Sequence, residues 1–246
     1  MKRFIGYFDL LGYKEFILNN DTAEVRRRLR HVLQTIESAL GRGEREDVSD
    51  STYAADLKNS RIQCLNISDT IMFWTIDDSQ ASLTEFMDVC YKFNKEMNTY
   101  QFPVRGALVY EEIEIIKGAH NTLAGGMYNV NTMYGKGLIN AHLKCENQMW
   151  AGTVMDKSLE DFIVSNGDSS VLAPIAIKYM VPYKTPPADQ IEEYALRLVS
   201  SSLNDVAFKN LCRDLDNIFK RDKKGMGGTA PLKLANTLLY AEKFKA

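Results

Sequence analysis

The sequence predicts an α+β fold built on a mixed, largely antiparallel sheet covered by helices, and two observations support this prediction. Short apolar segments rich in aromatic and β-branched residues alternate with longer segments whose apolar residues recur at helical spacing. Of the 246 residues, 45% are hydrophobic and 25% are charged, as in an ordinary globular protein. A chain of this length forms one large domain, or one domain with an attached extension.

The first 155 residues contain the elements that define the fold. Asp69 lies at the turn of a predicted hairpin, and residues 102–110 and 111–116 are expected to form a second hairpin. The polar stretches 44–60 and 121–131 are expected to be loops. The expected strands are residues 4–11, 61–67, 70–76, 102–110 and 149–155, and the expected helices are residues 23–40, 80–100 and 134–147.

The rest of the chain continues the alternation. Residues 175–183 are expected to form a strand, and residues 221–229 a flexible basic break. The expected helices there are residues 192–203, 205–220 and 232–244.

The order of the elements, β-α-β-β-α-β followed by further α and β segments, is that of the ferredoxin-like split β-α-β arrangement. We expect its helices on one face of the sheet. In this topology Asp9 and Asp69 would lie at the ends of two neighbouring central strands.

Charge and composition exclude several classes of function. The formal net charge of -2 gives no broad attraction for nucleic acid or anionic membrane. The apolar segments are shorter than the roughly 20 residues that span a bilayer, and residues 1–4 lead directly into a strand without a signal-peptide pattern. The four cysteines are scattered, as expected for reduced thiols, so we expect a cytoplasmic protein.

Two aspartates are the strongest candidates for chemistry. Asp9 ends the apolar run Arg3–Leu11, and Asp69 lies between two β-like stretches. A carboxylate among apolar neighbours is costly to bury unless it is neutralised. Two of them at strand ends therefore suggest a shared divalent cation, although either aspartate could instead cap a turn.

Four motifs in the same order resemble those of the class III nucleotidyl cyclases. They are Phe8-Asp9-Leu10-Leu11-Gly12-Tyr13, Asn66-Ile67-Ser68-Asp69-Thr70-Ile71-Met72, Val104-Arg105-Gly106-Ala107-Leu108 and Gly135-Lys136-Gly137-Leu138-Ile139-Asn140-Ala141. The matches cover residues 3–155, the expected catalytic core of a single cyclase domain spanning 1–246, with 156–246 as a C-terminal α/β extension. Within that superfamily the chain more closely resembles the Pycsar pyrimidine nucleotide cyclases, which make cyclic UMP or cyclic CMP in bacterial antiphage defence.

The resemblance implies two divalent metal ions, Mg²⁺ or Mn²⁺, held by Asp9, Asp69 and the main-chain carbonyl of Leu10. It implies that Asn140 and Lys144 act on the α-phosphate. An alignment shifted by one residue removes both matches, and either residue could simply be part of a polar helix face.

Other positions implied by the resemblance concern the phosphates and the base. Arg105 and Lys136 are alternative phosphate contacts. Leu65 and Met133 occupy the positions where purine cyclases carry polar base-reading residues. This favours a pyrimidine, UTP before CTP, and Asn66 offers an amide to the base.

The resemblance also implies a homodimer with sites at the interface and a separate effector that responds to the cyclic nucleotide. Two alternatives remain open: a divergent adenylyl or guanylyl cyclase, and a catalytically silent domain that dimerises or binds a nucleotide.

Overall fold

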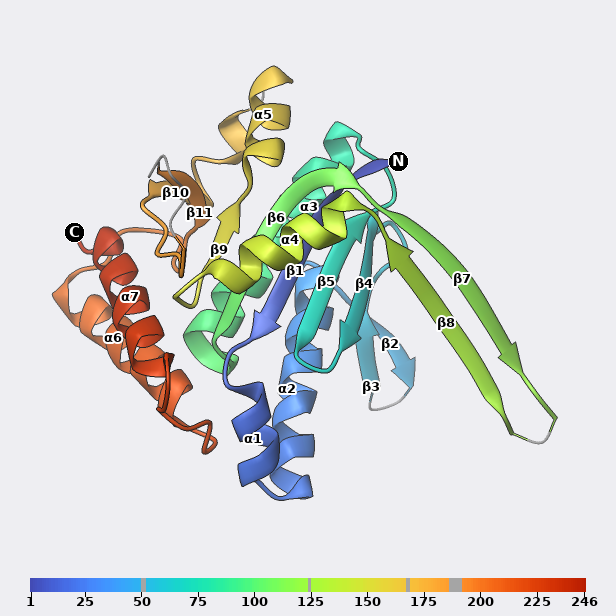
Figure 1. Cartoon of the computed structure of the whole chain (residues 1–246), viewed down its shortest axis with the longest axis horizontal. Helices are drawn as coiled ribbons and strands as arrows, with labels where there is room; N and C mark the ends of the chain where they lie inside the picture. The colour runs from blue at the N-terminus through green and yellow to red at the C-terminus, as the bar shows by residue number, and fades with distance from the viewer. Residues whose placement is uncertain (50–51, 124, 167–168, 186–191) are drawn as a thin grey trace.

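The computed structural model describes residues 1–49, 52–123, 125–166, 169–185 and 192–246. Its centre is a seven-stranded sheet in the order β10-β11-β9-β6-β1-β5-β4 (Figure 1). The β6–β9 pair is parallel and the other pairs are antiparallel, so the sheet is mixed, as predicted. Its strands are β1 (Lys2–Leu10), β4 (Ile62–Ile67), β5 (Thr70–Thr75), β6 (Val104–Glu112), β9 (Thr153–Met155), β10 (Ala176–Tyr179) and β11 (Glu193–Leu196).

The ferredoxin-like core predicted from the element order is confirmed. It consists of β1, α2 (Thr22–Leu40), β4, β5, α3 (Gln80–Glu96) and β6. In the sheet these strands lie in the order β6-β1-β5-β4, which places β1 between its two antiparallel partners. The expected helix 80–100 ends at Glu96, and a short π-helix, Met97–Gln101, leads into β6.

Helices cover both faces of the sheet, whereas we expected them on one face. Phe8 of β1 packs edge-on against Phe93 of α3, with ring centroids 4.9 Å apart, in the core that α2 and α3 cover. Ile5, whose side chain points to the other face because side chains alternate along a strand, belongs to a second cluster with Ala141 of α4 (Lys136–Asn147). This helix, expected over residues 134–147, begins two residues later than expected, at Lys136.

Two segments expected to be loops contain strands. Within residues 44–60, β2 (Arg45–Ser49) pairs with β3 (Thr52–Ala55). Within residues 121–131, β8 (Met127–Tyr134) begins and pairs with β7 (Glu114–Asn121), not with β6. Neither ribbon shows the strict apolar–polar alternation that marks a half-buried strand, so the sequence pattern did not reveal them.

The expected second hairpin between 102–110 and 111–116 is also wrong, because the two segments do not pair with each other. β6 continues to Glu112, opposite Lys2 of β1, and Ile113 is buried where the chain leaves the sheet. The β7–β8 ribbon then projects away from the body (Figure 1).

The C-terminal part extends the same sheet and adds a helical pair. The expected helix 192–203 is wrong: Ala195 and Leu196 are both buried in β11, which pairs with β10 and β9. Because adjacent residues of β11 are both buried, the strand does not show the apolar–polar alternation that would have distinguished it from a helix. The helices α6 (Asp205–Lys220) and α7 (Ala230–Ala241) are near their expected positions, whereas α1 (Tyr13–Asn19) and α5 (Lys157–Ser165) were not expected.

Within the described ranges, no helix is both long and apolar enough to cross a membrane.

Candidate functional site

The structure places Asp9 and Asp69 at the same edge of the sheet. Asp9 lies opposite Thr70 in the β1–β5 pair, and Asp69 immediately precedes that strand. The backbone amide of Leu10 donates a hydrogen bond of 2.9 Å to the carbonyl oxygen of Asp69. The end of β1 and the β4–β5 turn are thus joined directly, as the topology predicted.

The β4–β5 turn has a strained residue beside the second aspartate. Ile67 pairs with Thr70, so Ser68 and Asp69 form a two-residue turn. Ser68 has φ 56°, in the left-handed region where glycine is favoured. Hairpin turns of this length require positive φ at their first central residue, which explains why the chain adopts it even with a side chain present.

Arg105 fixes the position of the Asp9 carboxylate. It lies opposite Asp9 in the β1–β6 pair, and its Nε donates to Oδ2 of Asp9 over 2.8 Å. Its Nη1 donates to the carbonyl oxygen of Glu146 over 2.9 Å, and Nη2 also pairs with the Glu146 carboxylate. The side chain of Arg105 is only 7% exposed, so this arrangement is largely shielded from solvent.

The electrostatics of Asp9 favour a nearby cation. Burial raises the pKa of Asp9, Arg105 opposes this shift, and the negative charge of Asp69 raises the pKa further. Only Oδ2 of Asp9 is bonded to Arg105. Among the described residues, the Asp69 carboxylate has no hydrogen bond or ion pair, so it too can bind a cation.

These groups fit a divalent metal. Carboxylate and carbonyl oxygens are the ligands preferred by Mg²⁺ and Mn²⁺, and the Leu10 carbonyl belongs to the same strand end. In the described part of the chain, no group of three or more Asp, Glu, His or Cys side chains could hold a metal. Further ligands would therefore come from water and from substrate phosphates, as is usual for Mg²⁺.

Among the described residues of one chain, no hydrogen bond or ion pair joins the residues expected on α4 to the aspartates. Lys136 and Asn140 are exposed. The ammonium of Lys144 instead pairs with Asp156 (3.0 Å) and with Glu193, so it is already neutralised inside the chain. Burial lowers the pKa of Lys144, but these two carboxylates outweigh burial and the net shift is upward.

The two positions expected to read the base meet in one apolar cluster. Leu65 and Met133 both pack against the cluster that contains Trp74 and Ala141. Asn66 follows Leu65 on β4, so its side chain points to the opposite face of the strand, and its amide donates to the carbonyl oxygen of Thr70 over 3.0 Å. The position therefore presents apolar side chains, and the exposed Asn66 lies on the other face.

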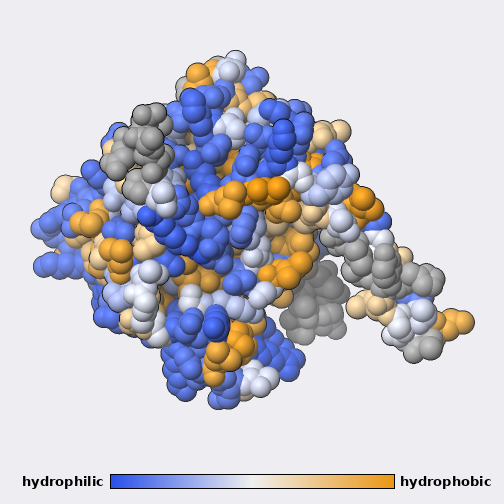
Figure 2. All heavy atoms as spheres, viewed as in Figure 1, coloured by the Kyte–Doolittle hydropathy of each residue, from blue (hydrophilic) through white to orange (hydrophobic). Residues whose placement is uncertain are grey.

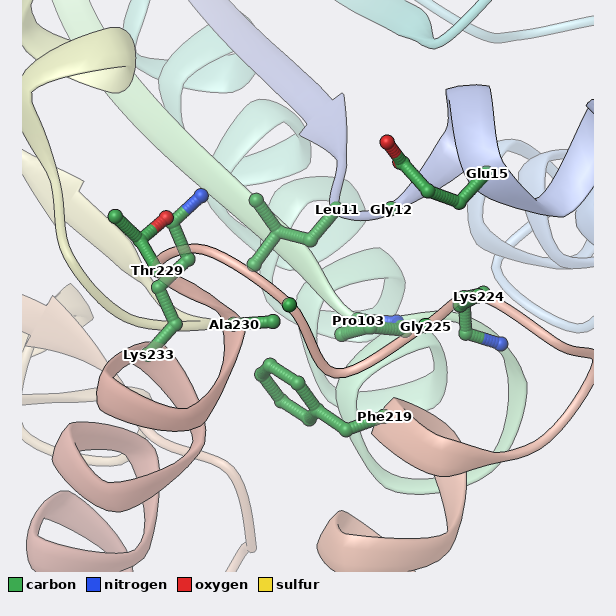
Figure 3. A pocket seen from close by; sticks show the side chains of 11 residues that line it. Leu11, Gly12, Glu15, Pro103, Phe219, Lys224, Gly225, Thr229, Ala230 and Lys233 are labelled. Atoms are coloured by element: carbon green, nitrogen blue, oxygen red, sulfur yellow. The ribbon is translucent and has the colours of Figure 1, made fainter.

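The structure adds residues that sequence reasoning did not assign to the site. Glu146 holds Arg105. A cavity of about 250 Å³, lined by Leu11 and Pro103 among others, lies next to the end of β1 (Figure 3). We call this cavity the C-terminal pocket; its lining includes Leu11, Gly12, Pro103, Gly225, Thr229 and Lys233. The feature of the sequence that could have indicated this pocket is the glycine-rich stretch before α7, which the sequence analysis interpreted as part of a flexible basic break.

Comparison with known proteins identifies the fold. No family model and no curated protein sequence matches the chain. Among solved structures, the guanylate cyclase domain of RhGC from Catenaria anguillulae, in complex with GTP, matches with a TM-score of 0.51 and 9% identity, over 80% of this chain and 96% of that one.

Two further structures give the same result. The catalytic core of a rhodopsin-guanylyl cyclase with converted specificity, in complex with ATPαS, matches with a TM-score of 0.52 and 9% identity, over 79% and 94% of the two chains. The non-canonical dimeric guanylyl cyclase domain of the RhoGC fusion protein from the aquatic fungus Blastocladiella emersonii matches with a TM-score of 0.51 and 10% identity, over 79% of this chain and 95% of that one. The chain has the fold of a class III cyclase catalytic domain, as the sequence predicted.

Proposed function

Starting from this fold, we propose that the chain is a metal-dependent nucleotide cyclase. The proposal rests on one observation: Asp9 and Asp69 lie close together where β1 ends and β5 begins, and the Leu10–Asp69 hydrogen bond joins these two segments. We assign to Asp9, Asp69 and the Leu10 carbonyl the binding of two divalent ions, Mg²⁺ or Mn²⁺. Such ions lower the pKa of a ribose hydroxyl and offset charge on a leaving pyrophosphate.

The proposed reaction is an internal displacement at phosphorus. The 3′-hydroxyl oxygen bonds to the α-phosphorus, the bond from that phosphorus to the oxygen bridging the β-phosphate breaks, and pyrophosphate leaves. The hydroxyl proton passes to solvent. Arg105 acts in this scheme by keeping the Asp9 carboxylate in place, because its guanidinium is bonded to Asp9 and Glu146.

We propose a pyrimidine nucleoside triphosphate as the substrate, with UTP preferred over CTP. Leu65 and Met133 offer no polar group to a purine edge, and Asn66, the next residue on β4, carries an exposed amide. The biological proposal is the one that the sequence resemblance implies: a cytoplasmic enzyme whose cyclic nucleotide acts on a separate effector in antiphage defence.

A homodimer would bring α4 of one chain to the aspartates of the other. Figure 2 shows apolar side chains over α4, and two of them, Ile139 and Leu143, are each 59% exposed. They lie one above the other on α4 next to the exposed Asn140, and Lys136 lies one turn before Asn140. Covering this surface with a second copy would place both polar side chains at the interface, Asn140 toward the α-phosphate and Lys136 as a further phosphate contact.

The test is product identification from purified protein. ATP, GTP, CTP and UTP are each incubated with the protein and Mn²⁺, and the products are identified by mass spectrometry. We expect a cyclic pyrimidine monophosphate from the wild type and its loss in Asp69→Asn. The matched control is Asp161→Asn on α5, an exposed carboxylate that pairs only locally with Lys157 and should leave activity unchanged.

Other products identify the alternatives. Cyclic AMP or cyclic GMP that depends on Asp69 would make the protein a purine cyclase. The absence of any product would favour a silent nucleotide-binding domain, the second candidate. That candidate is favoured by Lys144, because both of its ion pairs must break before it can contact a phosphate.

A further inference from the structure

The C-terminal pocket lies where the proposed active site continues beyond the metal-binding aspartates. Leu11 follows Asp9 by two residues and Pro103 precedes Arg105 by two, and the Leu11 amide donates to the Pro103 carbonyl oxygen over 2.8 Å. The opposite wall comes from the segment between α6 and α7 and from the first turn of α7. Core and C-terminal extension thus share one cavity.

Lys233 is the cation that this cavity leaves without a partner. Its ammonium has no ion pair, hydrogen bond or aromatic contact among the described residues, and Figure 3 shows its side chain extending from α7 past Thr229 toward Leu11. Lys224 also lines the pocket, but its ammonium is paired with Asp222 (3.2 Å) and lies 4.2 Å from the Phe102 ring centroid. Lys224 is therefore a structural cation, and Lys233 is available for a ligand.

The charges around Lys233 indicate that an anion would be bound. Burial lowers the pKa of Lys233, and the cations Arg105 and Lys184 lower it further, against the opposing effect of Asp9 and Glu146. Both carboxylates are already paired with Arg105. A ligand with negative charge would offset this excess of positive charge.

The backbone of the pocket suits a phosphate. Gly225 and Gly227 line it, and α7 begins at Ala230 without a side-chain cap on its amino end. The Ala230 amide donates to the Gly227 carbonyl oxygen (3.2 Å) and Pro231 has no amide proton, so it is the positive end of the helix dipole that favours an anion here. The carboxylate in the lining, Glu15, is exposed on α1.

We propose that the C-terminal pocket binds the β- and γ-phosphates of the nucleotide, with Lys233 as their main side-chain ligand in the same chain. The C-terminal extension then completes the active site instead of only extending the sheet. This inference rests on the proposed cyclase function, which supplies a triphosphate at Asp9 and Asp69.

The experiment measures binding of inorganic pyrophosphate with Mg²⁺ by isothermal titration calorimetry, which requires no turnover. Lys233→Ala should weaken binding roughly tenfold, because a hydrogen bond to a charged group is lost. Lys233→Arg should retain most of the affinity. The matched control, Lys209→Ala, removes an exposed lysine of α6 and should bind like the wild type.

Two further measurements separate a phosphate contact from a general structural effect. Ala230→Leu keeps every charge but fills the pocket, into which the Ala230 side chain points (Figure 3), and it should also weaken pyrophosphate binding. Binding of UMP, which lacks the β- and γ-phosphates, should be unchanged in Lys233→Ala. Equal pyrophosphate affinity in Lys233→Ala and the wild type would overturn the inference, as would an equal loss of UMP binding.

The inference and the proposed function fail differently. A wild type that cyclises a nucleotide while Lys233→Ala keeps its pyrophosphate affinity contradicts only the pocket assignment. Pyrophosphate binding that depends on Lys233, in a protein that forms no cyclic product, supports the pocket and rejects the cyclase.

Discussion

At the scale of single residues, the buried Asp9–Arg105 pair defines the candidate site. Arg105 holds one carboxylate oxygen of Asp9 at 2.8 Å and is itself held by Glu146. Removing one partner from a buried pair leaves an uncompensated charge and costs about 3–5 kcal/mol. A variant at Asp9 would therefore affect folding as well as the proposed metal binding, whereas a variant at Asp69, which has no such partner among the described residues, tests the proposed metal binding alone.

Ser68 shows that the turn geometry matters more than the residue type. Its φ of 56° is strained for a residue with a side chain. We expect Ser68→Gly to raise the free energy of unfolding by about 0.5–1 kcal/mol, because relief of this strain exceeds the added flexibility of the unfolded chain. Urea denaturation monitored by circular dichroism measures the change.

Ser68→Ala is the control for this substitution. It removes the hydroxyl but keeps the Cβ atom that causes the strain, so it should not stabilise the protein. A gain in Ser68→Ala as large as that in Ser68→Gly would show that the hydroxyl, not the backbone, is responsible.

At the scale of elements, Gly135 determines how α4 meets the sheet. It has φ 137° and ψ 162°, a conformation almost exclusive to glycine, and a Cβ there would lie 2.4 Å from the carbonyl oxygen of Glu112. The β8–α4 junction therefore presses against the end of β6. The position of Asn140 depends on this contact, because α4 begins immediately afterwards.

Gly135→Ala should lower the free energy of unfolding by about 2–4 kcal/mol, because backbone strain and crowding add. Gly228→Ala is the matched control: its φ is 58°, but nothing lies within 4 Å of the added carbon. It should cost only about 1 kcal/mol. Equal losses in urea denaturation would mean that crowding beneath α4 contributes nothing.

At the scale of the whole molecule, the function proposed above draws on a second chain. No hydrogen bond or ion pair of the described residues links Asn140 to Asp9 or Asp69, and α4 exposes an apolar surface beside Asn140. A two-fold dimer repeats each contact, so two sites would form, each with aspartates from one chain and Asn140 from the other.

Mixing inactive variants tests this arrangement. Asp69→Asn and Asn140→Ala should each be inactive alone, but an equimolar mixture should recover about a quarter of wild-type activity, since half of the dimers are mixed and each has one intact site. Sedimentation confirms that dimers form. No recovery, in a mixture whose chains do exchange, would show that each site lies within one chain.

The sequence predicted those elements whose buried side chains recur at the regular spacing of a strand or a helix. Phe4, Phe8 and Phe93 lie at strand and helix spacing, and their burial made β1, α3 and the ferredoxin-like order evident. The sequence did not predict the β2–β3 and β7–β8 ribbons, because the apolar residues of these strands do not recur at every second position. β11 was read as a helix because its burial depends on neighbouring β9 and β10.

The sequence by itself determined the fold class and singled out Asp9 and Asp69 as candidates, because a carboxylate in an apolar segment is informative wherever it lies in space. Only the tertiary structure decided which charges are available. It paired Lys144 with Asp156 and Glu193, paired Arg105 with Asp9, and left Lys233 facing the C-terminal pocket. Ion pairing depends on distances between residues far apart in the chain, and no local pattern encodes those distances.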